Sequence, residues 1–126
     1  MSKLQDLITK FRADIPQFVS TDVVDIDAGM SIGGGSIDPN FDASVASASY
    51  AEVVKANAQA LDLLGLGASS TEDILITTRD VYLLIRMLGK KHYHGLAITK
   101  QGTLGYARAI MKKYEPLLLA AVRDLE

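Results

Sequence analysis

Apolar positions recur at helical spacing in the first, central and last parts of the chain. Near the N-terminus, four of them follow the i, i+3, i+4, i+7 pattern of one helix face: Leu4, Leu7, Ile8 and Phe11. Ser2 can cap this helix, which is expected to end before Pro16 because the residue before a proline avoids the helical region. A second helix is predicted over residues 42–64 and a third after Thr103, with Pro116 expected to kink or split the third.

Runs of β-branched, aromatic and alternating residues between these helices predict five strands. They cover residues 18–26, 30–32, 73–78, 81–88 and 92–99. The glycine run Gly33-Gly34-Gly35 is expected to weaken the second strand through a bulge or a frayed edge. Short turns join consecutive strands, so the sheet is predicted to be antiparallel. The order α-β-β-α-β-β-β-α predicts a single α+β domain over residues 1–126, with helices packed on a five-stranded antiparallel sheet.

Composition narrows the class of protein. The 126 residues include no cysteine, which excludes disulfides, Cys-ligated metals and thiol nucleophiles. Lys and Arg number 13 against 15 Asp and Glu, so the chain lacks the basic surplus that binding to nucleic acid or an anionic membrane needs. The longest apolar run, residues 117–122, is far shorter than the ~20 residues of a membrane span. The first residues lack the apolar core of a signal peptide, so we expect a cytoplasmic protein.

The predicted central helix has one narrow polar stripe. Four side chains at i, i+3, i+7, i+10 form it: Glu52, Lys55, Gln59 and Asp62. The rest of its circumference is apolar or small, whereas an ordinary surface helix has a single apolar stripe. This helix therefore has two faces to bury, of which its own sheet covers one. We expect a dimer interface to bury the second, through residues that include Ala51, Val54, Ala58 and Leu61.

The glycine-rich segment over residues 31–36 could present backbone amides to a phosphate group. No Gly-Lys-Ser/Thr follows it and the dinucleotide fingerprint is missing, so a flexible loop or a bulge is the favoured interpretation. His92 and His94 share one side of a strand and could bind a metal ion together. Zinc needs three or four ligands, however, so we expect surface or partly buried histidines.

Three aspartates have a faintly calcium-like spacing: Asp22, Asp25 and Asp27. The glutamate that a calcium loop carries at its twelfth position is missing, so turn and edge-charge roles are favoured. Ser36 does not lie in a Gly-x-Ser-x-Gly motif, and no Ser-His-Asp arrangement is recognisable. We therefore predict a protein that is not an enzyme, with no catalytic residue, no cofactor and no metal ion.

Several motifs resemble the Roadblock/LC7 family, which includes dynein light chains and MglB-like proteins. Residues 15–19 resemble the family's lead-in to the first strand, and residues 23–29 resemble its Val-Val-Asp-x-Asp-Gly hairpin. Residues 73–77 resemble the family's third strand. Residues 93–98 and 103–108 resemble its last strand and the start of its final helix. The likeness covers nearly the whole chain.

The resemblance implies a profilin-like sandwich that forms a homodimer. In relatives, the third strands pair across a two-fold axis and the two long central helices lie side by side. Ile74 and Ile76 would then join the dimer interface, and the pairing would remove an exposed sheet edge. Bacterial members of the family partner small Ras-like GTPases. The resemblance therefore implies a regulatory adaptor, with a GTPase-activating or a scaffold role and without a nucleotide or metal of its own.

On this interpretation the polar stripe of the central helix is the candidate contact with the GTPase: Glu52, Lys55, Gln59 and Asp62. Two alternatives stay open. A small-ligand sensor of profilin-like or PAS-like shape would need a pocket between the sheet and the helices. A purely structural assembly subunit would bind its partner and leave GTP hydrolysis unchanged.

Overall fold

The secondary structure follows the predicted α-β-β-α-β-β-β-α order, in a computed structural model that describes residues 2–125. The strands are β1 (Phe18–Asp25), β2 (Met30–Ser36), β3 (Ile74–Thr77), β4 (Val81–Leu88) and β5 (His92–Thr99). The helices are α1 (Lys3–Asp14), the short 3₁₀ helix η1 (Ala43–Ala46), α2 (Ser47–Leu63) and α3 (Leu104–Arg123). The strands form one antiparallel sheet in the order β2-β1-β5-β4-β3. The predicted α+β class is confirmed.

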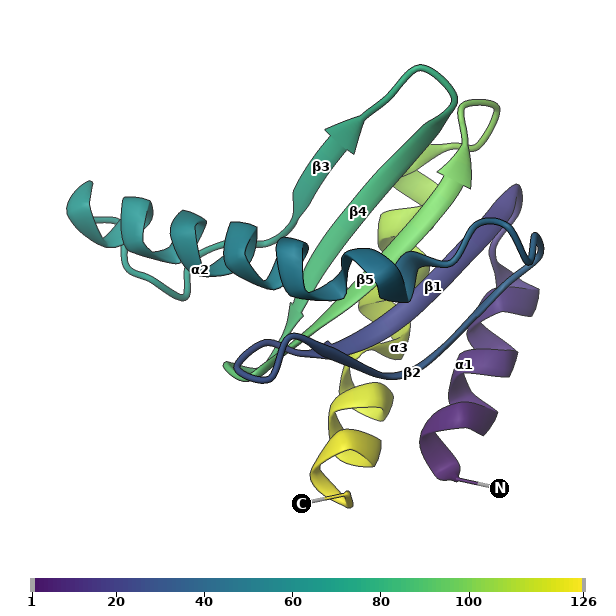
Figure 1. Ribbon diagram of the computed structural model, residues 1–126, viewed down its shortest axis with the longest axis horizontal. Coiled ribbons are helices and arrows are strands. Elements are labelled where there is room, and N and C mark those ends of the chain that lie inside the picture. Colours follow the sequence, from purple (N-terminus) through teal and green to yellow (C-terminus); the bar gives the residue numbers. More distant parts are fainter. Residues whose placement is uncertain (1, 126) are drawn as a thin grey trace.

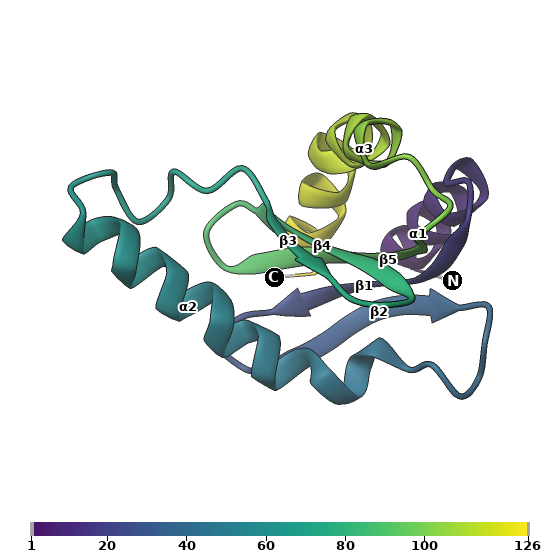
Figure 2. The same cartoon turned by 90° about the horizontal axis from the view of Figure 1, so that it is seen from above.

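The sheet lies between two helical layers. Helix α2 crosses one face (Figure 1), while α1 and α3 cover the other (Figure 2). The larger core fills the space between the sheet and the α1–α3 layer, and its largest fully buried members are Leu4, Ile8, Phe11, Leu84, Leu88, Ile98, Met111 and Leu118. A smaller core lies under α2 and consists of Val24, Ile26, Ala51, Val54, Ile85 and Tyr93.

Helix α1 begins and ends where the sequence predicts. The hydroxyl of Ser2 accepts a hydrogen bond from the Gln5 amide at 3.1 Å, which satisfies one of the free amides of the first turn. The helix ends at Asp14, and Ile15 is extended as the residue before Pro16 must be.

Strand β2 starts at Met30 as predicted and continues through the glycine run to Ser36. Its register against β1 shifts by one residue at Ile32, so a bulge is present but the strand does not fray. Glycine is needed beyond the bulge because α1 and β1 come close. A Cβ at Gly33 would lie 2.9 Å from the Ile8 side chain, and one at Gly34 would lie 2.6 Å from the carbonyl oxygen of Thr21.

Helix α2 begins later than predicted, at Ser47, because the preceding turn is η1 rather than α-helix. Asp42 caps η1 by accepting a hydrogen bond from the Ser44 amide at 3.0 Å. At its other end α2 stops as predicted. Gly65 adopts φ +76°, and the Leu66 amide donates to the carbonyl of Leu61 at 2.9 Å, which is the Schellman arrangement.

Helix α3 continues through Pro116, so the proline does not split it. Thr103 occupies the cap position, but its side chain makes no capping bond. The Thr103 carbonyl starts the helix instead by accepting from the Ala107 amide at 3.0 Å. Within residues 2–125, no helix combines the length and the apolar character needed to cross a membrane.

Candidate interaction surface

Helix α2 rests on the sheet with only its first half. Its buried residues are Ser47, Ala51 and Val54, and their 4- and 3-residue spacing places them in one row along the helix. Ala58 and Leu61 continue the same row but are only half-buried, because the second half of α2 extends past the sheet (Figure 1). The overhanging half thus carries a row of core-type positions that the sheet does not cover. The loop that returns to β3 lies beside it, and Asn57 Nδ2 of the helix donates to Thr71 Oγ1 of this loop at 2.7 Å.

This placement corrects the predicted membership of the second, intermolecular face. Ala51 and Val54 are 1% and 5% exposed and pack in the chain's own core, so neither lies on a separate second face of the helix. Val54 reaches an intermolecular contact only through the groove that it lines. The physical reason is that core residues and intermolecular candidates belong to the same row of the helix. The first part of the row lies over the sheet, and the rest lies beyond it. Ala58 and Leu61 remain candidates for an intermolecular contact.

A groove of about 370 Å³ opens where α2 leaves the sheet. Its apolar lining comes from the helix, β3, β4 and the end of β1: Ile26, Val54, Ala58, Ile74, Ile85 and Met87. Beyond the groove, the helix end exposes large apolar side chains at Leu63 (83%), Leu64 (71%) and Leu66 (62%). Apolar surface gathered in this way is typical of a protein-binding site rather than of a solvated helix end.

Strand β3 forms one edge of the sheet and, among the described residues, pairs only with β4. Ile74 and Ile76 are half-buried and pack against the core under α2, while Leu75 on the opposite face is 37% exposed. The strand has four residues with no charge and no proline, so it lacks the usual protection against pairing with another chain. The predicted edge position of Ile74 and Ile76 is what the structure shows.

The polar stripe of α2 is exposed as predicted. All four of its members face solvent: Glu52, Lys55, Gln59 and Asp62. Lys55 Nζ lies 3.3 Å from Glu52 Oε1 in an ion pair that is open to water. Such a pair contributes little to stability, about 0.3–0.5 kcal/mol. The stripe is therefore free to exchange its internal contact for contacts with a partner.

Asp22 is a polar residue whose burial the sequence did not reveal. It lies in β1 under the start of α2, is 6% exposed, and accepts a hydrogen bond from Ser47 Oγ at 3.3 Å. Burial raises the pKa of its carboxyl to about 6, the Ser47 bond opposes this rise, and the nearby Asp42 charge adds to it.

Asp25 has the predicted turn role, since its Oδ1 accepts from the Ala28 amide at 3.1 Å. Asp27 is exposed.

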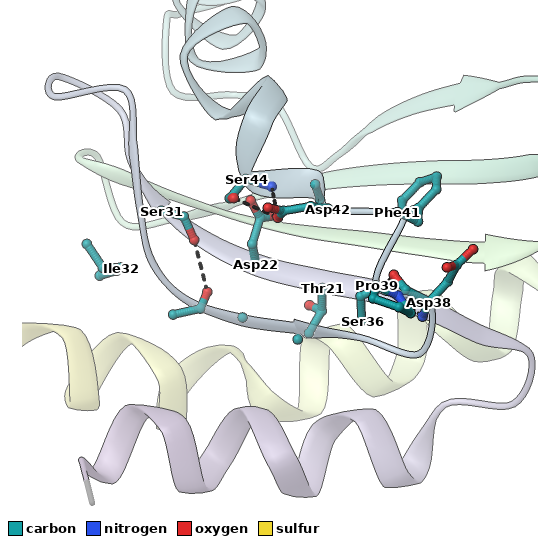
Figure 3. A pocket seen from close by; sticks show the side chains of 14 residues that line it. Thr21, Asp22, Ser31, Ile32, Ser36, Asp38, Pro39, Phe41, Asp42 and Ser44 are labelled. Carbon is teal, nitrogen blue, oxygen red and sulfur yellow. Dashed lines mark hydrogen bonds between the residues drawn. The ribbon is translucent and has the colours of Figure 1, made fainter.

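A second hollow of about 570 Å³ lies between β2 and the loop that leads to η1 (Figure 3). Its ionisable side chains are all acidic: Asp22, Asp38 and Asp42. Hydroxyls of Ser31, Ser36 and Ser44 line it as well, and none of its described lining residues is basic. The glycine run lies in an extended strand here and not at a helix start. Both observations argue against a phosphate site, because the amides are not presented as such a site requires and the lining repels anions.

The sequence matches no protein-family model and no curated protein. Solved structures are similar in three dimensions. MglB of Myxococcus xanthus aligns with a TM-score of 0.86 at 18% identity, over 98% of this chain and 90% of that one. A Roadblock/LC7 domain from Streptomyces avermitilis aligns with a TM-score of 0.74 at 12% identity, over 96% of this chain and 95% of that one. The chain has the Roadblock/LC7 fold. The fold is also profilin-like, as predicted, since profilin IB of Acanthamoeba castellanii aligns with a TM-score of 0.62 at 12% identity over 93% and 97% of the two chains.

In this Roadblock/LC7 fold both histidines are buried, so their predicted surface or partly buried position is wrong. His94 is 1% exposed, and its Nε2 lies 2.9 Å from Thr21 Oγ1. Its ring packs edge-to-face with the ring of Phe11, with the two ring centroids 4.5 Å apart. Burial, together with the positive charge of Arg86, lowers the pKa of His94 to about 3. A neutral ring whose Nε2 already contacts Thr21 is a core histidine. Among residues 2–125, no three metal-binding side chains gather.

The sensor alternative depends on space between the sheet and α2. Under the first half of the helix there is a small cavity of about 30 Å³, which is partly open to solvent. Pockets for small organic ligands measure roughly 300–1,000 Å³. This cavity is thus too small for such a ligand, whereas the 370 Å³ groove lies within that range. The larger groove lies under the second half of α2, next to the free edge of β3.

Proposed function

We propose that the chain is a non-enzymatic, homodimeric adaptor that binds a small Ras-like GTPase and modulates its nucleotide state or its localisation. The observation that carries the proposal is the half-supported helix α2, which holds uncovered core-type positions on one side and an exposed polar stripe on another. The similarity to MglB and to a Roadblock/LC7 domain supports the same interpretation.

In this proposal, a second copy of the chain covers the surfaces that are uncovered in this one. Pairing of β3 with β3 of a second copy around a two-fold axis would satisfy the free edge of each sheet. It would also extend the sheet beneath the overhanging half of α2. Ala58, Leu61 and the groove beside Ile74 would then be covered, as the rest of their row already is.

The GTPase would bind on the exposed stripe of α2. Glu52, Lys55, Gln59 and Asp62 make up this surface. Their side chains are polar and solvated, as expected for a contact that forms and dissociates. The resemblance to the Roadblock/LC7 family supplies the class of partner. The near-neutral charge, a net of −2, gives no support for nucleic acid or an anionic membrane as the partner, and we propose that the adaptor acts in the cytoplasm.

Light scattering tests the homodimer first. We expect twice the chain mass of 13.6 kDa at micromolar concentration. Ala58→Arg places a long charged side chain in the uncovered row and should give monomers. Ala60→Arg is the matched control, because Ala60 is exposed on the same helix and the dimer should persist. A monomeric natural chain contradicts the homodimer.

Affinity capture with the dimer tests the partner. A small Ras-like GTPase should be retained, and Glu52→Lys or Gln59→Lys should weaken its binding about tenfold, or 1.4 kcal/mol. The purified pair then decides the role. Faster GTP hydrolysis indicates an activator, whereas unchanged hydrolysis and exchange indicate a scaffold. A dimer that binds no small GTPase contradicts this part of the proposal and leaves the homodimer standing.

A further inference from the structure

The 30 Å³ cavity under the first half of α2 has a polar wall. Ser20 and Asp22, two residues apart on β1, point to the same face of the sheet and line it. They pair with Ala97 and Gly95 on β5, whose small size leaves the space open. A Cβ at Gly95 would lie 2.7 Å from Asp22 Oδ1, so the carboxyl oxygen occupies the place that a side chain would take.

The hydroxyl of Ser20 lacks a partner in this wall. The residue is 2% exposed, and no group in residues 2–125 makes a hydrogen bond to its Oγ. A buried polar group left without a hydrogen bond destabilises the folded state, because its lost contacts with water are not replaced. Asp22 has one side-chain bond, the 3.3 Å bond from Ser47 Oγ to its Oδ2, so its Oδ1 still has the capacity to accept.

We propose that this cavity binds one ordered water molecule, which hydrogen-bonds to Ser20 Oγ and donates to the Asp22 carboxyl group. The cavity has room for a water molecule, and the two side chains supply the minimum of two polar partners that such a water needs. The water completes the bonding of Ser20 and contributes a second hydrogen bond to Asp22.

The site lies at the base of α2. Asp22 accepts from Ser47, the first residue of that helix, and the Tyr93 hydroxyl donates to the Ser47 carbonyl at 3.5 Å. The bound water therefore joins Ser20 of β1 to the start of α2 through Asp22. The titratable groups that face Asp22 are Asp42 at the start of η1 and Tyr93 on β5, and neither carries a positive charge. A hydrogen bond from water is thus an uncharged means of stabilising the carboxylate.

An atomic-resolution crystal structure of the natural chain tests the site directly. We expect one density peak within hydrogen-bond distance of Ser20 Oγ and an Asp22 oxygen. Ser20→Val fills the cavity with two methyl groups and should remove the peak. A clear cavity without density in the natural chain overturns the proposal.

A carbon-13 titration of the Asp22 carboxyl tests the predicted bond in solution. Because a donated hydrogen bond stabilises the carboxylate, its loss in Ser20→Val should raise the pKa of Asp22 by about one unit. Ser20→Ala removes the hydroxyl without filling the cavity and serves if the valine variant does not fold, with a rise in the same direction. Thr77→Val, which exchanges a hydroxyl for a methyl at an exposed strand position, should leave this pKa unchanged. An unchanged pKa in both Ser20 variants contradicts the bond to Asp22.

Discussion

Arg108 holds Asp73 by two parallel hydrogen bonds, Nε to Oδ2 at 2.8 Å and Nη2 to Oδ1 at 3.2 Å. The pair joins the first turns of α3 to the residue just before the edge strand β3. Both residues belong to motifs that carry the Roadblock/LC7 resemblance, residues 73–77 and 103–108. Two motifs that lie about 30 positions apart in the sequence thus meet in one contact. The forked pairing fixes where β3 begins at the free edge of the sheet.

Removing this pair should loosen β3 more than the rest of the chain. Arg108→Ala should lower the free energy of unfolding by about 1 kcal/mol, because the pair is bidentate but partly solvated. Amide hydrogen exchange should rise first in β3. Lys55→Ala, which removes the exposed pair with Glu52, is the control and should change stability by less than about 0.5 kcal/mol. Equal effects of the two variants would contradict a structural role for the Arg108 pair.

Asp22→Asn should stabilise the protein at neutral pH. The folded-state pKa of Asp22 is raised from 3.8 to about 6, so between these values the folded chain binds more protons than the unfolded one. Stability from this group therefore falls as pH rises from about 4 to about 6, and the loss is complete at pH 7. The shift corresponds to about 3 kcal/mol as an upper limit. Urea unfolding at pH 4 and pH 7 measures it, and the gain should appear only at pH 7. Asp27→Asn, at an exposed turn position, should give no such difference.

His94 should stay neutral in acid that protonates ordinary histidines. Its pKa is lowered from 6.5 to about 3, so below pH 6.5 the unfolded chain binds the extra proton and folding stability falls. The expected slope from this residue is about 1.4 kcal/mol per pH unit between pH 6 and pH 4. Imidazole NMR should show no titration of the folded His94 signal down to pH 5. A midpoint near 6 would contradict the buried, Thr21-bonded ring.

Two glycine-to-alanine exchanges should act in opposite directions. At Gly34 a Cβ would lie 2.6 Å from the backbone carbonyl oxygen of Thr21, so Gly34→Ala should destabilise the chain by about 3 kcal/mol. Gly105 lies in the first turn of α3, and no atom is within 4 Å of an added Cβ. Gly105→Ala should therefore stabilise it by about 0.5 kcal/mol, through helix propensity alone. Thermal and urea unfolding measure both changes, and a tolerated alanine at Gly34 would contradict the close approach of β2 to β1.

Local signals predicted most of this fold. Ser2 and Gly65 mark helix ends through bonds to residues within one turn, so the sequence alone was sufficient there. The start of α2 was misplaced because Asp42 caps a 3₁₀ turn as readily as an α-helix. The sequence left the extent of β2 open between a bulge and a frayed edge, because the need for glycine there arises from close contacts with α1 and β1.

The candidate surface was only partly predictable, for a similar reason. The exposure of the polar stripe of α2, which includes Glu52, follows from helical periodicity. Which residues of the apolar row have a sheet beneath them depends on where the sheet ends, and periodicity carries no such information. Hence Ala51 and Val54 were grouped with Ala58. Asp22 alternates with apolar neighbours as a solvent-facing strand residue does, and only the tertiary packing of η1 and α2 buries it.

Because only the first half of α2 rests on the sheet, the two halves of the helix are under different constraints on which residues they can carry. Positions up to Val54 are constrained by the chain's own core, because any change there must still fill the space above Val24 and Tyr93. Positions from Ala58 to the exposed leucines are free of that constraint. Substitutions can accumulate in this half without unfolding the domain. The surface of this half can thus change while the fold stays the same, in keeping with three-dimensional similarity to a solved structure at 18% identity.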